Sequence, residues 1–420
     1  MSMDLLYENN RRFMPVEHLP ERVLIWDETL RDGEQTPGVA FHIEEKTAIA
    51  RALAEAGVSV IDAGMPIVSE DEREAIRQII ELELPCEVGV TVRSHEADLK
   101  AAGECGVQHV YMFLSVSPLH MKCKFGMQSY TELREIALRH VALAVKMGFT
   151  PTFIAEDSTG ASPEELIALF TALHGEGVQR VIICDTAVRM PAPLAFYEFC
   201  RYIIGNAPRE LTFCVHCHND LGEATANTVL AILAGATVPT VTMNGIGERA
   251  GNAALEQVVI SLEKMGVRTG VHLDALFDLS RLVARCSGIP LSMHSPVVGL
   301  NAFRHESGIH AAGVLEDPRT YETILPEEVG RERELIFGKH SGRHQLAALL
   351  ERHGIPHTPL MIDQLLHEIK FLKESQSHRP LEEMVETLDA YYRANFGVAE
   401  AMILDRAREM NDDDILANAA

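Results

Sequence analysis

The stretch RVLIWDETLRDGEQTPG, residues 22–38, decides the fold class of this chain. Residues 22–27 form a short apolar run that is typical of a buried β-strand. A doubly wound open sheet usually has a glycine-rich turn after its first strand, but here acidic residues, an arginine and a threonine follow. The stretch therefore favours a (β/α)8 barrel, which belongs to the α/β class.

The rest of the chain repeats this alternation of short and long apolar patterns. Amphipathic runs at 44–57, 162–177 and 252–266 predict helices, and Ser162 is a candidate N-cap for the second of them. Eight strands with intervening helices over about 230 residues match a TIM barrel. The predicted strands are 22–27, 58–64, 86–92, 107–115, 150–156, 179–185, 211–218 and 237–245.

The pattern changes after residue 285, where turns and histidines become frequent. Further helices are predicted at 360–374 and 380–395, before the acidic tail NDDDILANAA at 411–420, which we expect to be solvated or disordered. The predicted organisation is an N-terminal extension (1–21), a catalytic TIM barrel (22–285), a linker subdomain (286–350) and a smaller, mainly helical C-terminal region (351–420).

Composition excludes several kinds of partner. The 420 residues carry a net charge of −24 and no basic run, so we expect binding neither to nucleic acid nor to an anionic membrane. The eight cysteines are scattered, which is typical of reduced thiols in a cytosolic protein. The start has acidic residues and no apolar core like that of a signal peptide, and no apolar run approaches the roughly 20 residues that span a bilayer. These observations predict a cytoplasmic protein.

Charged and polar residues gather where the predicted strands end. Active sites of TIM barrels lie at the carboxyl ends of the strands, so this placement predicts an enzyme. The segments are DETLRDGEQTPG (27–38), EDSTG (156–160), DTAVRMP (185–191), HCHND (216–220) and NGIGERAGN (244–252).

Two histidines at the end of the seventh strand suggest a metal site. His216 and His218 are two residues apart, so in an extended strand both side chains point to the same face. Two imidazoles with a carboxylate and an amide oxygen suit Zn²⁺, Mn²⁺ or Mg²⁺, and Asp32 and Asn252 can complete the set. The alternative is a pair of core histidines whose nitrogens are hydrogen-bonded.

The segment GIGERAG, residues 245–251, resembles a dinucleotide-binding fingerprint, but its last two glycines are one residue too far apart and it follows the eighth strand. A tight turn into the next helix explains it better than a nucleotide site.

Five segments together resemble a known family. They are DETLRDGEQTPGV (27–39), VHCHNDLGEATANT (215–228), NGIGERAGNAALEQVV (244–259), HESGIH (305–310) and FGKHSGRHQL (337–346). Over about residues 22–350 the chain resembles the homocitrate synthase, 2-isopropylmalate synthase and citramalate synthase group of the DRE-TIM metallolyases. The resemblance implies a divalent metal and a Claisen condensation of acetyl-CoA, the co-substrate, with a 2-oxo acid, followed by thioester hydrolysis, as in amino-acid biosynthesis.

The resemblance also implies roles for single residues. Arg31 would be the catalytic cation beside the keto oxygen, Glu156 an active-site glutamate and Thr186 a hydroxyl that holds the substrate carboxylate. His310 and Tyr321 would be a catalytic pair lent to the neighbouring subunit, which implies a homodimer. The metal ligands would be Asp32, His216, His218 and Asn252.

The chemistry of the residues agrees with these roles. A 2-oxo acid offers two oxygens to a metal, and Arg31 can stabilise the alkoxide that forms on attack; the alternative for Arg31 is a surface ion pair. The sequence departs from many relatives at Ala312, where they have an aspartate, so the orientation of His310 is in question. Residues 356–420 have the pattern of helices and a tail, so we expect no regulatory domain like that of feedback-inhibited isopropylmalate synthases.

The substrate is the least constrained prediction. The short chain and the run IDAGMPIVSEDEREAIRQI (61–79) resemble nitrogen-fixation-type homocitrate synthases, which favours 2-oxoglutarate. Alternatives are pyruvate, 2-oxoisovalerate or another apolar 2-oxo acid, as in citramalate, isopropylmalate or specialised alkylmalate synthases, and, further off, a lyase or carboxyltransferase of the superfamily. The distal carboxylate of 2-oxoglutarate needs a cationic partner, for which the candidates are Arg93, His120, Lys122 and Lys124.

Overall fold

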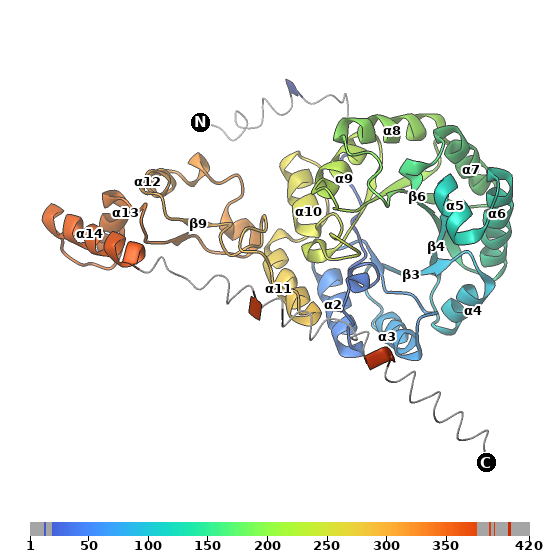
Figure 1. The fold of residues 1–420 in the computed structure, drawn as a ribbon, viewed down its shortest axis with the longest axis horizontal. Helices are drawn as coiled ribbons and strands as arrows, with labels where there is room; N and C mark the ends of the chain where they lie inside the picture. Colours follow the sequence, from blue (N-terminus) through green and yellow to red (C-terminus); the bar gives the residue numbers. More distant parts are fainter. Residues whose placement is uncertain (1–11, 14–18, 376–385, 388–389, 391–401, 405–420) are drawn as a thin grey trace, which may run out of the picture. The chain divides into compact units, whose positions relative to one another are not determined.

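The computed structural model describes residues 12–13, 19–375, 386–387, 390 and 402–404. Its main feature is a closed barrel of parallel strands in the order β1 to β8, which confirms the predicted TIM barrel (Figure 1). The strands are β1 (Trp26–Asp27), β2 (Val60–Asp62), β3 (Glu87–Arg93), β4 (His109–Ser115), β5 (Thr150–Glu156), β6 (Arg180–Asp185), β7 (Thr212–Cys217) and β8 (Val238–Val241).

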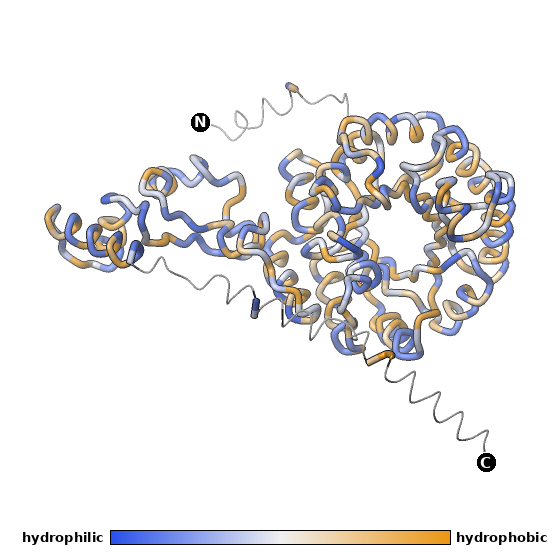
Figure 2. Tube along the Cα trace, in the orientation of Figure 1, coloured by the Kyte–Doolittle hydropathy of each residue, from blue (hydrophilic) through white to orange (hydrophobic). Residues whose placement is uncertain are grey.

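The helices between the strands form a ring around the barrel (Figure 1). Hydrophilic and hydrophobic residues alternate along them (Figure 2), as expected for helices with one face on the sheet and one in water. They are α2 (Ile43–Glu55), α3 (Glu70–Glu81), α4 (Glu96–Glu104), α5 (Pro118–Phe125), α6 (Tyr130–Lys146), α7 (Pro163–Gly175), α8 (Pro193–Asn206), α9 (Ala224–Leu233), α10 (Leu255–Lys264) and α11 (Leu276–Ser287).

Serine side chains define where several of these helices begin. The hydroxyl of Ser162 accepts a hydrogen bond from the Glu165 N–H, which confirms the predicted N-cap of α7. Ser117 and Ser129 cap α5 and α6 in the same way. The side chain of a capping serine accepts a hydrogen bond from a backbone N–H that has no partner inside the helix. Each of these helices therefore begins directly after its serine.

The first and last strands are shorter than predicted. Before Trp26 the chain bonds to a loop instead of a strand, with the Val23 N–H 3.0 Å from the Arg268 carbonyl. After Val241 the 3₁₀ helix η3 (Met243–Gly245) begins, and Asn244 has a left-handed backbone with φ of 63°. These local turns end the strands without opening the barrel.

Large side chains fill the inside of the barrel near its amino-terminal end. The rings of Trp26 and Tyr111 lie 4.2 Å apart, and Arg180 lies over the Trp26 ring at 5.4 Å. Arg180 pairs with Glu87, which also accepts a hydrogen bond from the Tyr111 hydroxyl. These side chains close the inside of the barrel at this end, and the amino-terminal side of Glu87 and Arg180 borders a separate surface cavity. The buried core cluster is Trp26, Val60, Tyr111, Ile154, Ile182, Cys184, Cys214 and Val238.

The chain forms two compact units. The first comprises the described residues of Met1–Thr36 with Phe41–Phe303 and Ile324–Arg333; the second comprises Pro37–Ala40, Arg304–Thr323 and the described residues of Glu334–Ala420. Residues 286–303 and 324–333, which we predicted as part of a separate subdomain, thus group with the barrel. One reason is the buried Arg331, whose guanidinium lies 4.7 Å from the ring centroid of Phe277 in α11 and also donates a hydrogen bond to the Gly299 carbonyl.

The second unit is small and mainly helical. A pair of short parallel strands, β9 (Arg304–His305) and β10 (Glu334–Leu335), accompanies α12 (Gly308–Glu316), α13 (Arg343–Arg352) and α14 (Pro359–Ser375). Leu346 and Leu350 of α13 pack against Ile362 and Leu366 of α14. The predicted helix at 360–374 is confirmed; most of the predicted helix at 380–395 and the acidic tail lie outside the described residues.

Two glycines let the helices of the second unit meet. A Cβ on Gly308 would lie 2.6 Å from the Gly342 Cα, so only hydrogen fits between the first turns of α12 and α13. This contact explains why glycine follows serine in both HESGIH and FGKHSGRHQL. Among the described residues, no helix has both the length and the apolar character needed to cross a membrane.

A buried glutamate makes barrel stability depend on pH. Glu256 of α10 is 1% exposed, and burial raises the pKa of its carboxyl to about 7 although the Asn244 N–H donates to it. Between pH 4.5 and 7 the folded protein therefore holds a proton that the unfolded chain releases, so stability falls as pH rises. We expect the free energy of unfolding of Glu256→Gln, relative to that of the wild type, to increase by on the order of 2 kcal/mol as the pH rises from 5 to 8.

Urea unfolding at both pH values, followed by fluorescence of Trp26, the one tryptophan of the chain, measures this. Glu55→Gln, at an exposed glutamate that ends α2, is the control and should follow the wild type at both pH values. Equal pH profiles for Glu256→Gln and wild type would contradict a protonated buried acid.

Candidate active site

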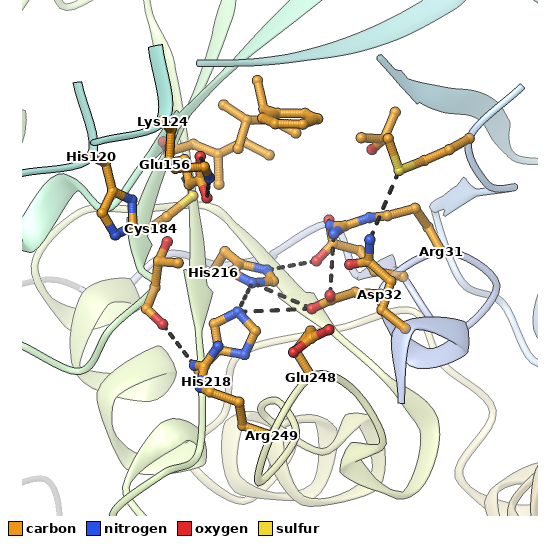
Figure 3. A pocket seen from close by; sticks show the side chains of 18 residues that line it. Arg31, Asp32, His120, Lys124, Glu156, Cys184, His216, His218, Glu248 and Arg249 are labelled. Atoms are coloured by element: carbon orange, nitrogen blue, oxygen red, sulfur yellow. Dashed lines mark hydrogen bonds and ion pairs between the residues drawn. The ribbon is translucent and has the colours of Figure 1, made fainter. Parts of the chain in front are cut away.

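A pocket of about 400 Å³ opens at the carboxyl ends of the strands (Figure 3). It collects residues from the loops after most strands, as expected for a TIM barrel. Its lining comprises Glu28, Arg31, Asp32, Gln35, Met65, Thr91, Phe113, His120, Lys124, Ile154, Glu156, Ile182, Cys184, Thr186, His216, His218, Glu248 and Arg249.

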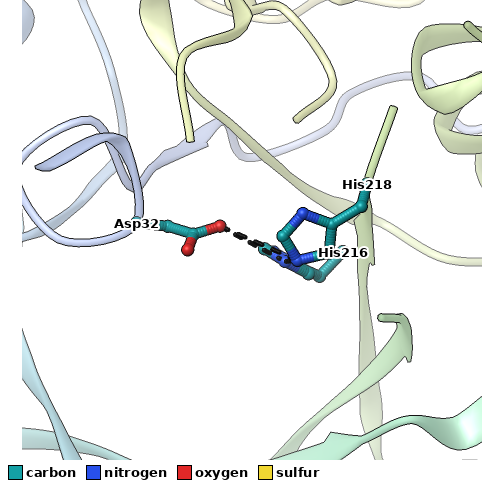
Figure 4. Close-up of side chains that lie close together, drawn as sticks. All are labelled: Asp32, His216 and His218. Atoms are coloured by element: carbon teal, nitrogen blue, oxygen red, sulfur yellow. Dashed lines mark hydrogen bonds and ion pairs between the residues drawn. The ribbon is translucent and has the colours of Figure 1, made fainter. Parts of the chain in front are cut away.

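The predicted metal ligands meet at one side of this pocket. The Nε2 atoms of His216 and His218 lie 3.1 Å apart, and both face Asp32 Oδ2, at 3.6 and 4.0 Å (Figure 4). One ligand atom from each residue lies within 4.8 Å of the other two, and all three side chains are buried. Two imidazole nitrogens and a carboxylate oxygen that converge in this way suit a divalent cation.

Hydrogen bonds leave the right nitrogen of His216 available for a metal. Its Nδ1 lies 2.6 Å from Glu28 Oε2 and 2.9 Å from Thr240 Oγ1, so the proton belongs on Nδ1 and the Nε2 lone pair is free. A carboxylate behind a histidine is the usual support of a metal ligand. Burial opposes a charge on His216, but Glu28 raises its pKa. Burial and the neighbouring His216 lower the pKa of His218 to about 4, so its imidazole is neutral at pH 7.

Asn252 provides the test of whether a metal fits. Its Nδ2 donates to Asp32 Oδ2 at 2.7 Å, while its Oδ1 is buried without a hydrogen-bond partner among the described residues. A buried amide oxygen without a partner is unfavourable, and metal coordination would satisfy it. The four residues thus form a mixed nitrogen and oxygen donor set that fits Zn²⁺, Mn²⁺ or Mg²⁺.

Arg31 lies beside the same cluster and is fixed by three acids. Its guanidinium contacts Glu28 at 2.5 Å, Asp62 at 3.1 Å and Asp32 at 3.3 Å, and its side chain is 12% exposed. Burial would lower the pKa of Arg31, but these carboxylates raise it well above its usual value, so it stays cationic. The Asp62 carboxyl, by contrast, has a pKa raised to about 7 by burial despite Arg31.

A buried lysine holds the loop that carries Arg31 and Asp32. Lys46 of α2 is 1% exposed, and its Nζ contacts Glu34 Oε2 at 2.7 Å and Glu72 Oε2 at 2.5 Å. Glu34 in turn accepts a hydrogen bond from the Phe41 N–H. Through Lys46, these bonds tie the middle of the loop after β1 to α2 and α3.

The opposite wall of the pocket carries Glu156, His120 and Thr186. Glu156 is held by Ser115 and by Lys124, whose Nζ lies 2.6 and 2.9 Å from its two carboxylate oxygens. Figure 3 shows Glu156 and Lys124 next to His120. The structure therefore brings Glu156, Thr186 and His120 to the same pocket as Arg31 and the metal ligands.

Arg93 does not join this pocket, contrary to the predicted role in substrate binding. Its guanidinium forms hydrogen bonds of 2.9 and 2.8 Å with the two oxygens of Asp98, a buried residue at the start of α4, and it is not part of the lining. A bidentate arginine–carboxylate pair is stronger than a single hydrogen bond, and Asp98 is only five residues from Arg93, so Arg93 is held away from the pocket. Lys122, a candidate on α5, is exposed and also lies outside the lining.

His310 and Tyr321 lie together in the second unit. Their ring centroids are 4.2 Å apart, and Tyr321 is 47% exposed. Nearby, His305 Nε2 lies 3.0 Å from Glu322 Oε1. Ala312 is half-buried in α12. The role of the pair toward the barrel stays a prediction.

Several residues of the site lie in predicted segments, but no role was predicted for them. Glu28 belongs to segment 27–38 and Asp62 to the second predicted strand, and both support Arg31. The apolar part of the lining lies mostly in predicted strands, but the strand pattern alone did not mark it as a pocket wall. It consists of Met65, Phe113, Ile154, Ile182 and Cys184.

Two family models match the chain. Residues 22–283 match the model described as HMGL-like, and residues 297–377 match the one described as homocitrate synthase post-HMGL domain-like. The first match covers the barrel, and the second covers most of the described remainder.

Named relatives are similar over most of the chain. A probable 2-isopropylmalate synthase of Ignicoccus hospitalis is 43% identical over 88% of this chain and 92% of its own length. The homocitrate synthase AksA of Methanopyrus kandleri is 42% identical over 88% of this chain and 93% of its own. The (R)-citramalate synthase CimA of Methanocaldococcus jannaschii is 43% identical over 83% of this chain and 70% of its own length.

Solved structures agree on the fold. A hydroxymethylglutaryl-CoA lyase of Pseudomonas aeruginosa superposes with a TM-score of 0.58 at 21% identity, over 65% of this chain and 95% of that one. At this sequence identity the structural similarity supports the barrel fold but no particular activity or substrate.

Proposed function

The chain belongs to the HMGL-like family, and from this premise we propose that it condenses acetyl-CoA with a 2-oxo acid and hydrolyses the thioester product, as an acyltransferase of the homocitrate and isopropylmalate synthase type. The observation that carries the proposal is the convergence of Asp32, His216 and His218 beside Arg31 in one pocket. The synthase names of relatives at about 40% identity support it.

The pocket residues can perform the electrostatic part of this reaction. A divalent metal held by Asp32, His216, His218 and Asn252 would supply Lewis acidity toward the keto and carboxylate oxygens of a 2-oxo acid. Arg31, held in place by Glu28 and Asp62, stabilises the negative charge that develops on the keto oxygen, and its fixed position requires no reorganisation. Thr186 donates a hydrogen bond to the substrate carboxylate.

The proton of the acetyl methyl group needs a base. We assign this role to His310, because histidine is the most common general base in enzymes, with Tyr321 as the neighbour of its ring. Glu156, which Lys124 and Ser115 hold, lines the pocket that contains Arg31 and the proposed metal ligands.

The pocket suggests a 2-oxo acid with an apolar side chain. The apolar part of its lining offers no partner for a second carboxylate. The lysine and arginines of the lining are already paired: Arg31 with Glu28 and Asp62, Lys124 with Glu156, and Arg249 with Asp220. Burying an unpaired carboxylate costs several kcal/mol. This favours 2-oxoisovalerate, pyruvate or a specialised apolar acid over 2-oxoglutarate, which the sequence favoured.

Homocitrate formation from 2-oxoglutarate remains the second candidate, because Lys124 and His120 line the pocket and could receive a distal carboxylate if Lys124 left Glu156. A thiol-release assay with acetyl-CoA and a panel of 2-oxoglutarate, 2-oxoisovalerate, pyruvate and an aryl 2-oxo acid decides between them by kcat/KM. Turnover with none of these acids would overturn the proposed reaction and point to a lyase or carboxyltransferase.

We also propose a homodimer in which His310 and Tyr321 serve the partner's barrel. Mixing the inactive variants Arg31→Ala and His310→Ala is then expected to restore partial activity after subunit exchange, because some heterodimers hold one site with both residues intact. Each variant alone, taken through the same exchange, is the control. Mixtures that stay inactive although exchange is demonstrated by differently tagged subunits would contradict the arrangement.

A further inference from the structure

Asp157 combines a left-handed backbone with a buried carboxylate directly after β5. Its φ and ψ are 60° and 43°, and its side chain is fully buried. Aspartate tolerates this conformation better than most residues, yet it remains unfavourable outside glycine. A buried carboxylate is also unfavourable unless it is well bonded. Both features therefore require compensation by specific contacts.

The backbone of Asp157 orients the hydroxyl of Thr186. The Asp157 N–H donates to Thr186 Oγ1 at 2.9 Å, which occupies one lone pair of that oxygen. Within the described part of the chain, the hydroxyl proton has no protein acceptor among the hydrogen bonds that Thr186 makes. Thr186 is thus a donor held at the pocket wall.

The carboxylate of Asp157 joins two more loops. Arg189, in the loop after β6, lies 2.9 and 3.0 Å from its two oxygens through Nε. Ser117 donates to Oδ2 and accepts from the His120 N–H, so the same carboxylate fixes the first turn of α5. His120 Nε2 lies 3.6 Å from Oδ2, while its Nδ1 is buried and has no hydrogen-bond partner in the described residues.

Close packing keeps this arrangement together. A Cβ on Gly160 would lie 2.7 Å from Arg189 Nε and 3.0 Å from Ser117 Cβ, so the turn after Asp157 has no room for a larger residue. Three consecutive loops are therefore packed around one carboxylate.

We propose that Asp157 is a positioning residue, which holds the Thr186 hydroxyl and the His120 imidazole in the orientation that binds the 2-oxo acid. This inference rests on the proposed function and adds to it. Asp157 is not among the residues that line the pocket, so it acts through Thr186 and His120, which line it.

Asp157→Asn tests the role of the carboxylate, because asparagine keeps the backbone N–H and the tolerance for positive φ. We expect KM for the 2-oxo acid to rise about tenfold or more, the scale of one lost hydrogen bond to a charged group, with KM for acetyl-CoA unchanged within about twofold. The matched control is Asp98→Asn, which breaks another buried aspartate–arginine pair, with Arg93, outside the pocket. It should lower the melting temperature similarly and leave both KM values unchanged.

A double-mutant cycle with His120→Ala separates positioning from general damage. The KM effects of Asp157→Asn and His120→Ala should be less than multiplicative, whereas those of Asp98→Asn and His120→Ala should multiply. If Asp157→Asn does not fold, Ser117→Ala breaks the same link to α5 and should raise the same KM by a smaller factor. If the wild type is active and folded Asp157→Asn has an unchanged KM for the 2-oxo acid, this inference alone is overturned. The same holds if the KM effects of Asp157→Asn and His120→Ala multiply. Absence of wild-type turnover overturns the proposed function as well.

Discussion

Arg31→Lys is expected to lower kcat by about two orders of magnitude or more, the scale of losing one preorganised donor to a developing oxyanion. Lysine keeps the charge but has no planar fork. It cannot contact Glu28 and Asp62 at once as the guanidinium does, at 2.5 and 3.1 Å. The remaining ammonium would lie off the position where negative charge develops.

Steady-state kinetics with the best 2-oxo acid measures this effect. Arg180→Lys is the matched control, because Arg180 is similarly buried and paired with Glu87 but lies at the amino-terminal end of the barrel. We expect it to change the melting temperature and leave kcat within about twofold. Near-normal turnover by Arg31→Lys would assign the transition-state cation to another residue.

Removal of the metal is the second prediction with a large effect. Chelator-treated protein is expected to lose at least 99% of its activity, on the scale of several kcal/mol that a Lewis acid supplies. Adding back one of Zn²⁺, Mn²⁺ or Mg²⁺ should restore it. Elemental analysis should find one divalent ion per chain before treatment.

Metal content of variants tests the ligand set without reference to activity. His216→Ala removes one of the two facing nitrogens and should reduce the bound metal by at least tenfold. His140→Ala, on the outer helix α6, is the control and should keep a full complement. Full activity in chelated protein, or full metal content in His216→Ala, would show that this site does not hold the required ion.

The barrel was predictable because each strand and helix carries its own local pattern. The run at 150–156 forms β5 over the same residues, and Ser162 caps α7 as expected. The limits of β1 and β8 were not predictable, because they depend on turns such as Asn244 with its positive φ. Whether residues 286–303 group with the barrel also depends on distant contacts of Arg331, which lies over Phe277 of α11 and bonds to Gly299.

The candidate active site likewise has features that were predictable from local sequence and features that were not. His216 and His218 meet because the two-residue period of a strand is local, and Arg31 and Asp32 follow the first strand in one motif. Arg93, a predicted substrate-binding residue, lies outside the lining for a local reason: Asp98, five residues later, binds its guanidinium. Charge alone could not tell an arginine whose acidic partners lie in the pocket, such as Arg31, from one whose partner lies outside it, such as Arg93.

The sequence by itself determined that this chain is an α/β barrel with two histidines, an arginine and acids at the carboxyl ends of its strands. Only the tertiary structure decided how these groups support one another. Glu28 reaches His216, and Asp62 reaches Arg31, because closure of the barrel brings β1 between β8 and β2. Likewise, the φ of Asp157 places its N–H on Thr186. Such contacts join residues far apart in the chain, so no local pattern encodes them, whereas strand periodicity and helix caps act over a few residues and can be recognised in the sequence.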